Sequence, residues 1–211
     1  MKNILIIDLE LGNLKVFEHK LKLNNFDIKI SSSKAAIKAA DILILPGVGN
    51  FAEAMNFLIK NNLIDILNYK VLEKKTPIFG ICLGLQLFTE FSEEGNVKGL
   101  GWIKGITQKF RFSKKNYKVP HIGWNTLNFK KKSILLKDII EQQFFYFIHS
   151  YYLNEIKPEA ILTTTNYGID FVSSIEYENI AGTQFHPEKS HKDGLKIIFN
   201  FLEKYQDTVN V

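Results

Sequence analysis

A chain of 211 residues, 45% hydrophobic and 23% charged, is long enough to bury a core without disulfides or metals, and we expect one domain over residues 1–211. This composition excludes a disordered protein, and no repeat of about 20–50 residues indicates a solenoid. The N-terminal apolar run, Ile4–Ile7, is too short for a signal-peptide core or a membrane span. We therefore expect a cytoplasmic protein without a membrane partner.

The net charge of +5 is concentrated in residues 109–118 and 130–132. A basic patch can attract nucleic acid, but lysine runs are more often solvated loops. Phe110, Phe112 and Tyr117 lie between the charges and alternate as strand residues do, which favours a packing role over base stacking. We expect no nucleic-acid partner.

Short apolar runs alternate with helical patterns through the first half of the chain, in the order 4–7, 14–23, 26–30, 34–40 and 42–45. This βαβαβ order predicts a doubly wound, largely parallel α/β sheet with ligands at the carboxyl ends of its strands. Two further helical patterns, at 51–61 and 63–74, precede a buried strand at 77–80. The loops that follow strands are therefore the places to look for chemistry.

The second half contains six β-rich segments, at 106–112, 124–129, 144–148, 160–165, 171–177 and 180–184. They predict mixed β segments rather than continued βα repetition. In the closing helix, Leu195, Ile198, Phe199 and Leu202 fall at i, i+3, i+4 and i+7, so this helix should pack on the sheet.

The single cysteine, Cys82, follows the buried strand at 77–80 and is flanked by Gly80 and Gly84. One cysteine cannot form an intramolecular disulfide, so it is either a small buried hydrophobe or a nucleophile. Glycines at ±2 between a strand and a helix are typical of a nucleophile elbow, in which a sharp turn leaves no room for neighbouring side chains. The helix N-terminus would favour the thiolate, and the N–H of Leu83 would point where an oxyanion forms.

A cysteine nucleophile needs a base, and His186 stands two residues before Glu188 in a Pro-containing turn after a predicted strand. His186 can take the thiol proton, and Glu188 can orient its ring and stabilise the imidazolium. The alternative, a structural histidine, is the commoner role of a lone histidine. His19 and His191 are expected on the surface.

The loop at residues 46–50, Pro-Gly-Val-Gly-Asn, follows the third predicted strand. Its two glycines allow backbone conformations that could direct an N–H toward an oxyanion. It lacks the glycine spacing and lysine of a P-loop, which argues against a nucleotide site.

These motifs together resemble the class I glutamine amidotransferases, which use a Cys-His-Glu triad. The segments 119–125 (Val-Pro-His-Ile-Gly-Trp-Asn) and 147–152 (Phe-Ile-His-Ser-Tyr-Tyr), with the pair Glu94-Gly95 and the run 99–101, resemble more narrowly the glutaminase-subunit family of imidazole glycerol phosphate synthase. The similarity covers nearly the whole chain in the expected order.

The resemblance implies a flavodoxin-like fold, glutamine as the substrate and no metal or cofactor. It further implies an ammonia-accepting (β/α)₈ cyclase subunit that forms a heterodimer with the chain in histidine biosynthesis. Gly47 and Val48 would complete the oxyanion site. The glutamine pocket and the cyclase interface would be formed by Gly49, Gln86, Ser150 and Tyr151, and by Pro120, His121, Trp124 and Asn125, respectively. Read without the resemblance, Trp124 is as readily a core aromatic.

The segment after the first strand departs from the family pattern. Leu9 and Glu10 stand where the family usually has Tyr-Gly, and Lys15 and Val16 where it has Arg-Ser. Because this segment lies at the predicted site edge, the departures leave a second hypothesis open: a paralogous glutaminase that supplies a different synthase, such as one aminating a surface-polysaccharide sugar. A catalytically silent binding subunit is a third reading, which the intact triad argues against.

Overall fold

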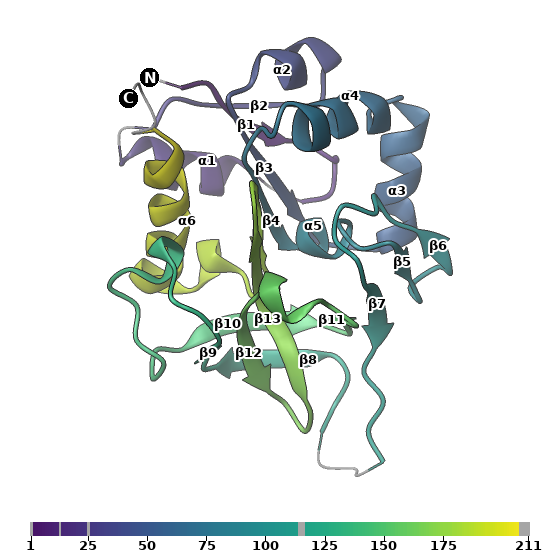
Figure 1. Ribbon diagram of the computed structural model, residues 1–211, viewed down its shortest axis with the longest axis vertical. Helices are drawn as coiled ribbons and strands as arrows, with labels where there is room; N and C mark the ends of the chain where they lie inside the picture. Colours follow the sequence, from purple (N-terminus) through teal and green to yellow (C-terminus); the bar gives the residue numbers. More distant parts are fainter. Residues whose placement is uncertain (1, 13, 25, 114–116, 207–211) are drawn as a thin grey trace.

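A mixed β-sheet forms the centre of the protein and contains strands from both halves of the chain (Figure 1). The computed structural model describes residues 2–12, 14–24, 26–113 and 117–206. The parallel part of the sheet has the order β2-β1-β3-β4-β14, with bounds Ile28–Ser31, Ile4–Ile7, Ile42–Gly47, Ile78–Cys82 and Ile180–Thr183. The chain passes to opposite sides of β1 to form β2 and β3, which creates the switch point of a doubly wound sheet. The predicted α/β class is confirmed.

Beyond β14 the sheet becomes mainly antiparallel through β13, β11 and β7, with bounds Asp170–Tyr177, Tyr151–Asn154 and Ile106–Lys109. The strands β5 (Phe91–Ser92) and β6 (Val97–Lys98) lie at its far edge, and β12 (Ile161–Asn166) joins β13 to β9 (Asn128–Phe129). A separate antiparallel pair consists of β8 (His121–Asn125) and β10 (Phe145–His149). The mixed β character predicted for the second half is confirmed.

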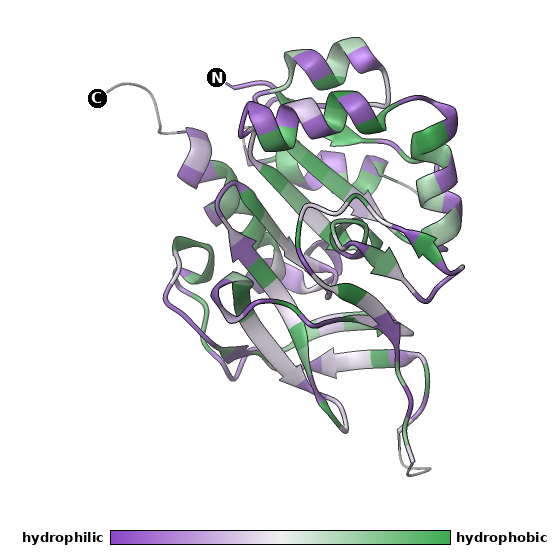
Figure 2. Cartoon of the chain, turned by 45° about the vertical axis from the view of Figure 1, so that its right-hand side comes forward, coloured by the Kyte–Doolittle hydropathy of each residue, from purple (hydrophilic) through white to green (hydrophobic). Residues whose placement is uncertain are grey.

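Helices cover both faces of the parallel strands, which Figure 2 shows mostly green. Leu5 and Ile7 pack toward α2 (Lys34–Ala39), α3 (Phe51–Lys60) and α4 (Ile64–Asn68), whereas Ile4 and Ile6 pack toward α1 (Lys15–Lys22) and α6 (His191–Gln206). Successive strand residues point to opposite faces, so a strand between two helical layers must be apolar at every position. The stripe predicted in α6 buries Ile198 and Leu202. Among the described residues, no helix is long and apolar enough to cross a membrane.

Some predicted elements differ from the structure. The strand predicted at 124–129 is two strands, β8 and β9, because Leu127 turns into the core and Asn125 Oδ1 accepts from the N–H of Thr126 at 2.9 Å. The helix predicted at 63–74 is α4 followed by a π-helical segment, Tyr69–Glu73. Strands β5, β6 and β11 were not predicted, and η2 (Ile134–Leu136), η3 (Pro158–Ala160) and η4 (Pro187–Lys189) are short 3₁₀ turns.

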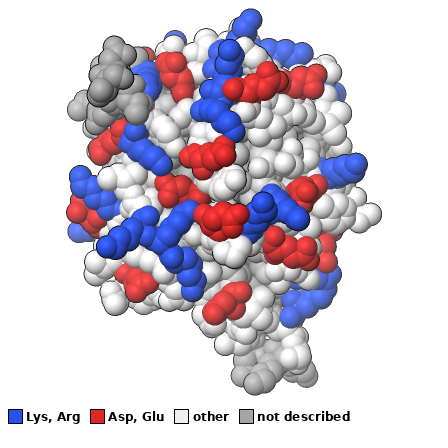
Figure 3. Space-filling model, viewed as in Figure 1, with Lys and Arg blue, Asp and Glu red and all other residues white. Residues whose placement is uncertain are grey.

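The basic segments make contacts within the protein. Lys131 Nζ donates to the backbone carbonyls of Glu159 and Glu176, each at 2.6 Å, and Arg111 pairs with Glu93 at 2.8 Å. Figure 3 shows Lys and Arg interspersed with Asp and Glu over the viewed face. Residues 114–116 of the first basic segment lie outside the described residues.

Candidate active site

The turn that carries Cys82 is the starting point of the site. Cys82 is the last residue of β4, not the residue after it, and has φ +51° and ψ −106°, a strained conformation for a side-chain-bearing residue. A Cβ on Gly84 would lie 1.7 Å from the carbonyl oxygen of Leu45, and one on Gly80 would lie 2.7 Å from Cα of Leu85. The steric reason for the Gly-x-Cys-x-Gly spacing is therefore confirmed.

Because Gly84 has no room for a side chain, replacing it should destabilise the protein. Gly84→Ala should lower the free energy of unfolding by roughly 3 kcal/mol or more, because backbone rather than a flexible side chain must move. Gly101→Ala is the matched control, since a Cβ there meets nothing within 4 Å and the alanine suffers only from φ +68°, which costs about 1–2 kcal/mol. Urea unfolding of both variants makes the comparison, and an equal or smaller loss at Gly84 would contradict the prediction.

The helix after Cys82 is shorter than the sequence suggests. α5 comprises only Leu83–Gln86, a single turn, so few peptide dipoles align behind the sulfur. Its contribution to stabilising a thiolate is correspondingly small, because the macrodipole is a sum over aligned peptides. Leu83 lies in the wall of the same cavity as Cys82, as the predicted oxyanion role requires.

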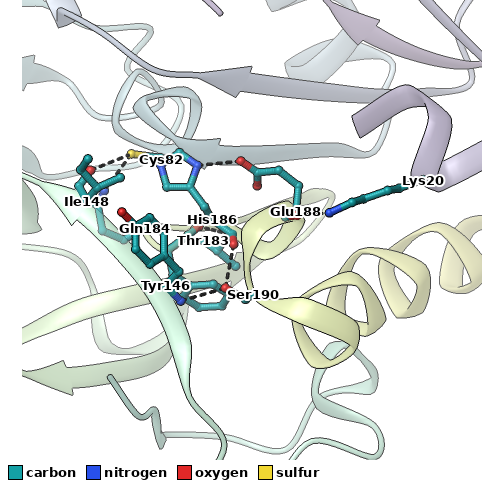
Figure 4. Close-up of polar contacts among 10 residues, drawn as sticks. Lys20, Cys82, Tyr146, Ile148, Thr183, Gln184, His186, Glu188 and Ser190 are labelled. Atoms are coloured by element: carbon teal, nitrogen blue, oxygen red, sulfur yellow. Dashed lines mark hydrogen bonds and ion pairs between the residues drawn. The ribbon is translucent and has the colours of Figure 1, made fainter. Parts of the chain in front are cut away.

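His186 and Glu188 lie on the turn after β14, beside Cys82 (Figure 4). His186 Nδ1 donates to Glu188 Oε1 at 2.8 Å, and the backbone N–H of His186 donates to the carbonyl of Tyr146 at 2.9 Å. Ser190 Oγ donates to the His186 carbonyl at 2.7 Å and accepts from the Tyr146 N–H at 2.8 Å. The turn is thus tied to β10, and the ring is held in one orientation.

The charge state of His186 suits a partner of a thiolate. Burial acts to lower the pKa of His186, but its interactions with Cys82 and Glu188 outweigh burial and raise this pKa to about 10. His186 is therefore protonated at neutral pH. Its Nε2 is buried without a hydrogen-bond partner among the described residues, and Figure 4 shows the ring between the sulfur and the carboxylate. Nε2 is the atom available to move a proton.

A cavity of about 420 Å³ opens at Cys82 and collects most of the predicted site. Its wall contains the predicted nucleophile, base, oxyanion and substrate residues Cys82, His186, Val48, Leu83, Gly49, Gln86, Ser150 and Tyr151, as well as Pro120. Gly47 lines a neighbouring cavity instead. Among the described residues no group of three or more His, Cys, Asp or Glu is placed to hold a metal ion.

Glu94 is a site residue that the sequence reasoning did not assign. Glu94 lies on the loop between β5 and β6 and lines the cavity that opens at Cys82. Its Oε2 accepts from the N–H of Phe51 at 2.9 Å. Burial raises the pKa of Glu94. A carboxylate on this wall is suited to an amino group of a substrate. The only sequence signal was its place in the Glu94-Gly95 pair.

His149 also lines the cavity but is not suited to act as the base. Its Nδ1 donates to the Tyr151 carbonyl at 2.8 Å, so its Nε2 accepts from Nδ1 of His121 at 3.0 Å. Burial lowers the pKa of His149 to about 3 and that of His121 to about 4. Both rings are neutral and support the wall that carries Tyr151.

The neighbouring cavity, of about 430 Å³, lies on the other side of the residue 46–48 loop. Val16, His186 and Glu188 are among the residues that line it. Lys20 Nζ donates to the Glu188 carbonyl at 2.7 Å (Figure 4). The segment that departs from the family pattern therefore reaches the site edge, as predicted from its place after the first strand.

The four residues predicted at the partner interface divide by exposure. Pro120 is exposed, Asn125 is half-buried, and Trp124 is 44% exposed and stacks on His191 at 4.8 Å. The core reading of Trp124 is wrong. His121 is 2% exposed, so its side chain does not reach the surface and the interface proposal rests on the other three.

A doubly wound sheet with a cysteine elbow, and a His-Glu pair beside it, is an arrangement for acyl transfer through a thiol nucleophile. The family model of glutamine amidotransferase class-I matches residues 5–205, and the chain belongs to this family.

Relatives within the family narrow the comparison. The imidazole glycerol phosphate synthase subunit HisH 2 of Methanococcus maripaludis is 47% identical, with 95% of this chain and 99% of the relative covered. The HisH subunit of Leptospira borgpetersenii is 43% identical, with coverage of 93% and 97%. A solved glutamine amidotransferase superposes with a TM-score of 0.73 at 16% identity, covering 96% of this chain and 98% of its own, and shows the same fold.

Proposed function

We propose that the chain is the glutaminase subunit of an imidazole glycerol phosphate synthase, with Cys82, His186 and Glu188 as its catalytic triad. The observation that carries the proposal is a cavity large enough for glutamine that is lined by Cys82 and His186, with Glu188 hydrogen-bonded to His186 from behind the cavity. The HisH relatives, which match almost end to end, support the assignment to this synthase.

The first half of the reaction forms a thioester. The Cys82 thiolate attacks the side-chain carbonyl carbon of glutamine, and the C=O electrons move to the oxygen. The N–H of Leu83 and a peptide N–H of the 47–49 loop stabilise this oxyanion. His186 Nε2 gives its proton to the leaving nitrogen, the C–N bond breaks, and ammonia departs from a γ-glutamyl thioester.

The second half releases glutamate. His186 is now neutral and takes a proton from water, whose oxygen attacks the thioester carbonyl. Collapse of the second tetrahedral intermediate expels the Cys82 thiolate and restores the ion pair. Glu188 holds the His186 Nδ1–H throughout, so the same nitrogen faces the reaction in both halves.

The partner would bind beside the cavity mouth. On the outer face of β8 and β10, Ile122 is 57% exposed and lies opposite Ile148, while Trp124 lies opposite Tyr146. A cluster of exposed apolar side chains is typical of a protein-binding surface. The Ile148 carbonyl lies 3.9 Å from Cys82 Sγ, so ammonia forms close to this surface. A (β/α)₈ cyclase bound here in a heterodimer would receive it.

The sequence left open a glutaminase for a different synthase. Val16, one of the departing residues, lines the cavity behind the triad rather than the glutamine cavity. The departures therefore leave the proposed chemistry unchanged, and the HisH relatives favour the histidine-pathway synthase over the alternative.

Two further expectations belong to the same proposal. One domain over residues 1–211 accords with a sheet that joins strands from β1 to β14, although residue 1 and residues 207–211 lie outside the described residues. A cytoplasmic location accords with a catalytic thiol, which must stay reduced.

The partner should activate the glutaminase. We expect the isolated chain to turn over glutamine roughly 10²–10³-fold more slowly than the complex, because a 47–49 peptide that does not face the cavity removes one oxyanion donor. A ligand shifts such a two-state peptide only through unequal affinity for the two states. The measurement is glutaminase kcat for the chain alone, with a histidine-pathway cyclase, and with that cyclase plus its nucleotide ligand.

A (β/α)₈ protein without cyclase activity is the control and should have no effect. Full activity of the chain alone would refute the gating. No response to the cyclase would indicate a different synthase.

A further inference from the structure

A buried glutamine that the mechanism does not use contacts the reacting sulfur. Gln184 follows β14, is fully buried, and its Nε2 donates to Cys82 Sγ at 3.6 Å (Figure 4). Parallel pairing of β14 with β4, with Gly182 opposite Gly80, brings Gln184 to the end of the strand that carries the cysteine. Gln184 does not line the cavity that opens at Cys82, so its contact with the sulfur is made from within the protein interior.

The orientation of the Gln184 amide follows from a second buried glutamine. Gln86 Nε2 donates to Gln184 Oε1 at 3.0 Å and to the Tyr151 carbonyl at 2.9 Å. Both acceptors are oxygens, so the nitrogen of Gln86 and the oxygen of Gln184 are identified by their partners. A flipped Gln184 amide would place one NH₂ against another. Gln184 must therefore present its NH₂ to the sulfur.

The sulfur has little other stabilisation from neutral donors. The second recorded partner of Cys82 Sγ is the Ile148 carbonyl at 3.9 Å, an acceptor that can bind a thiol but only repels a thiolate. The one-turn helix α5 offers a weak dipole. Beside the interaction with protonated His186, a directed N–H from Gln184 is a second contact that favours the thiolate over the thiol, because hydrogen bonds to an ionised atom are the stronger ones.

We propose that Gln184 is a further catalytic residue, which stabilises the Cys82 thiolate through its amide N–H, and that Gln86 is a positioning residue, which holds the Gln184 amide in the donating orientation. This inference rests on the proposed function, in which the thiolate is both the attacking and the leaving group. Gln184 would assist the second role as well, since the charge returns to sulfur when the thioester breaks. Gln86, predicted only to line the glutamine pocket, has both amide hydrogens committed and can offer the substrate its oxygen alone.

The alternative is that the two glutamines merely satisfy each other in the interior. Such a structural role would lower stability when either is replaced but would leave the ionisation of the sulfur unchanged. Cys82 is the only cysteine of the chain, so the rate of alkylation by iodoacetamide reports this sulfur alone. The pH dependence of that rate separates the two roles.

The experiment compares the alkylation pH profile of the wild-type chain with those of Gln184→Met and Gln86→Met. Loss of a hydrogen bond to a charged group should move the midpoint of the Gln184→Met profile up by about one pH unit, with a roughly tenfold slower reaction below the midpoint. Gln86→Met should move it in the same direction by less, because Gln184 keeps its N–H but not its orientation. In the complex, glutaminase kcat should fall with KM little changed for Gln184→Met.

Asn200→Leu is the matched control. Asn200 is also buried, and its Nδ2 donates to the carbonyls of Leu135 and Lys137 at 3.1 and 2.9 Å, far along the chain from the elbow. It should lose stability without a shift in the profile. An unchanged midpoint in Gln184→Met would overturn the proposal. If that variant does not fold, an unchanged midpoint in Gln86→Met overturns it instead.

Alkylation needs neither glutamine nor a partner. A shifted profile, together with no glutaminase activity even in the cyclase complex, would therefore reject the proposed function and keep the role of Gln184 in the ionisation of the sulfur. An active glutaminase whose alkylation profile is unshifted in Gln184→Met would support the proposed function and overturn this inference.

Discussion

Cys82→Ala abolishes glutamine-dependent turnover, while turnover with added ammonium salt continues near the wild-type rate. The sulfur is the atom that would bond to the glutamine carbon, and no other cysteine exists to replace it. Loss of a covalent nucleophile costs on the order of 10⁴–10⁶ in kcat. In the proposed complex the partner would use free ammonia, so its own chemistry would not depend on the sulfur. The measurement is product formation by the assembled synthase with glutamine or with ammonium salt as the nitrogen source.

Alanine is smaller than cysteine and fits the strained elbow without new contacts, so the variant should fold and bind the partner. Co-purification with the cyclase is the control for assembly. Retained glutamine hydrolysis would remove Cys82 from the mechanism. A parallel loss of ammonia-dependent turnover would show that the substitution damages the complex rather than the chemistry.

His186→Ala has the second largest effect, and Glu188→Gln a smaller one. In the proposed mechanism His186 Nε2, which lies beside Cys82, would move the proton in both halves of the reaction, whereas Glu188 would act through the 2.8 Å hydrogen bond to Nδ1. We expect His186→Ala to approach the loss in Cys82→Ala, and Glu188→Gln to retain roughly 10- to 100-fold more activity. Glutaminase kcat of the cyclase complex is the quantity to compare.

His19→Ala serves as the control, because His19 is exposed on α1 and should not affect turnover. Equal losses in His186→Ala and Glu188→Gln would contradict the division of roles. Such a result would mean that the raised pKa of His186 depends on the Glu188 charge so strongly that the base fails without it.

Sequence patterns were enough to predict the elements that are determined by residues close together in the chain. The central parallel strands β1, β3 and β4 are buried and without a charged or hydroxyl side chain at every position because helices cover both faces, and this signal is read directly along the chain. The elbow was predictable because its glycine spacing is visible within five residues. The steric demand on Gly80 is local, at Leu85, whereas that on Gly84 comes from Leu45 of the neighbouring strand β3. The spacing of His186 and Glu188 likewise belongs to a single turn.

Contacts between distant strands were decided by the tertiary structure. Pairing of β14 with β4 brings His186 and Gln184 to Cys82, and no spacing within the chain marks Gln184 as a partner of the sulfur. Glu94 reaches the cavity from the loop between β5 and β6, two strands too short to be predicted. The pairing partner of a short strand is chosen by the sheet, so the pattern of two residues carries little information.

The residue types of this protein determined its fold class and the chemical groups of its triad, because hydrophobic periodicity and the Gly-x-Cys-x-Gly spacing can be read from neighbouring residues. The tertiary structure decided which of these side chains are exposed to solvent. His121 and Trp124 lie on the same short strand, three residues apart, yet His121 is buried against His149 while Trp124 faces outward. A β-strand offers two faces, and only the packing of β8 against β10 and the core selects which face meets solvent.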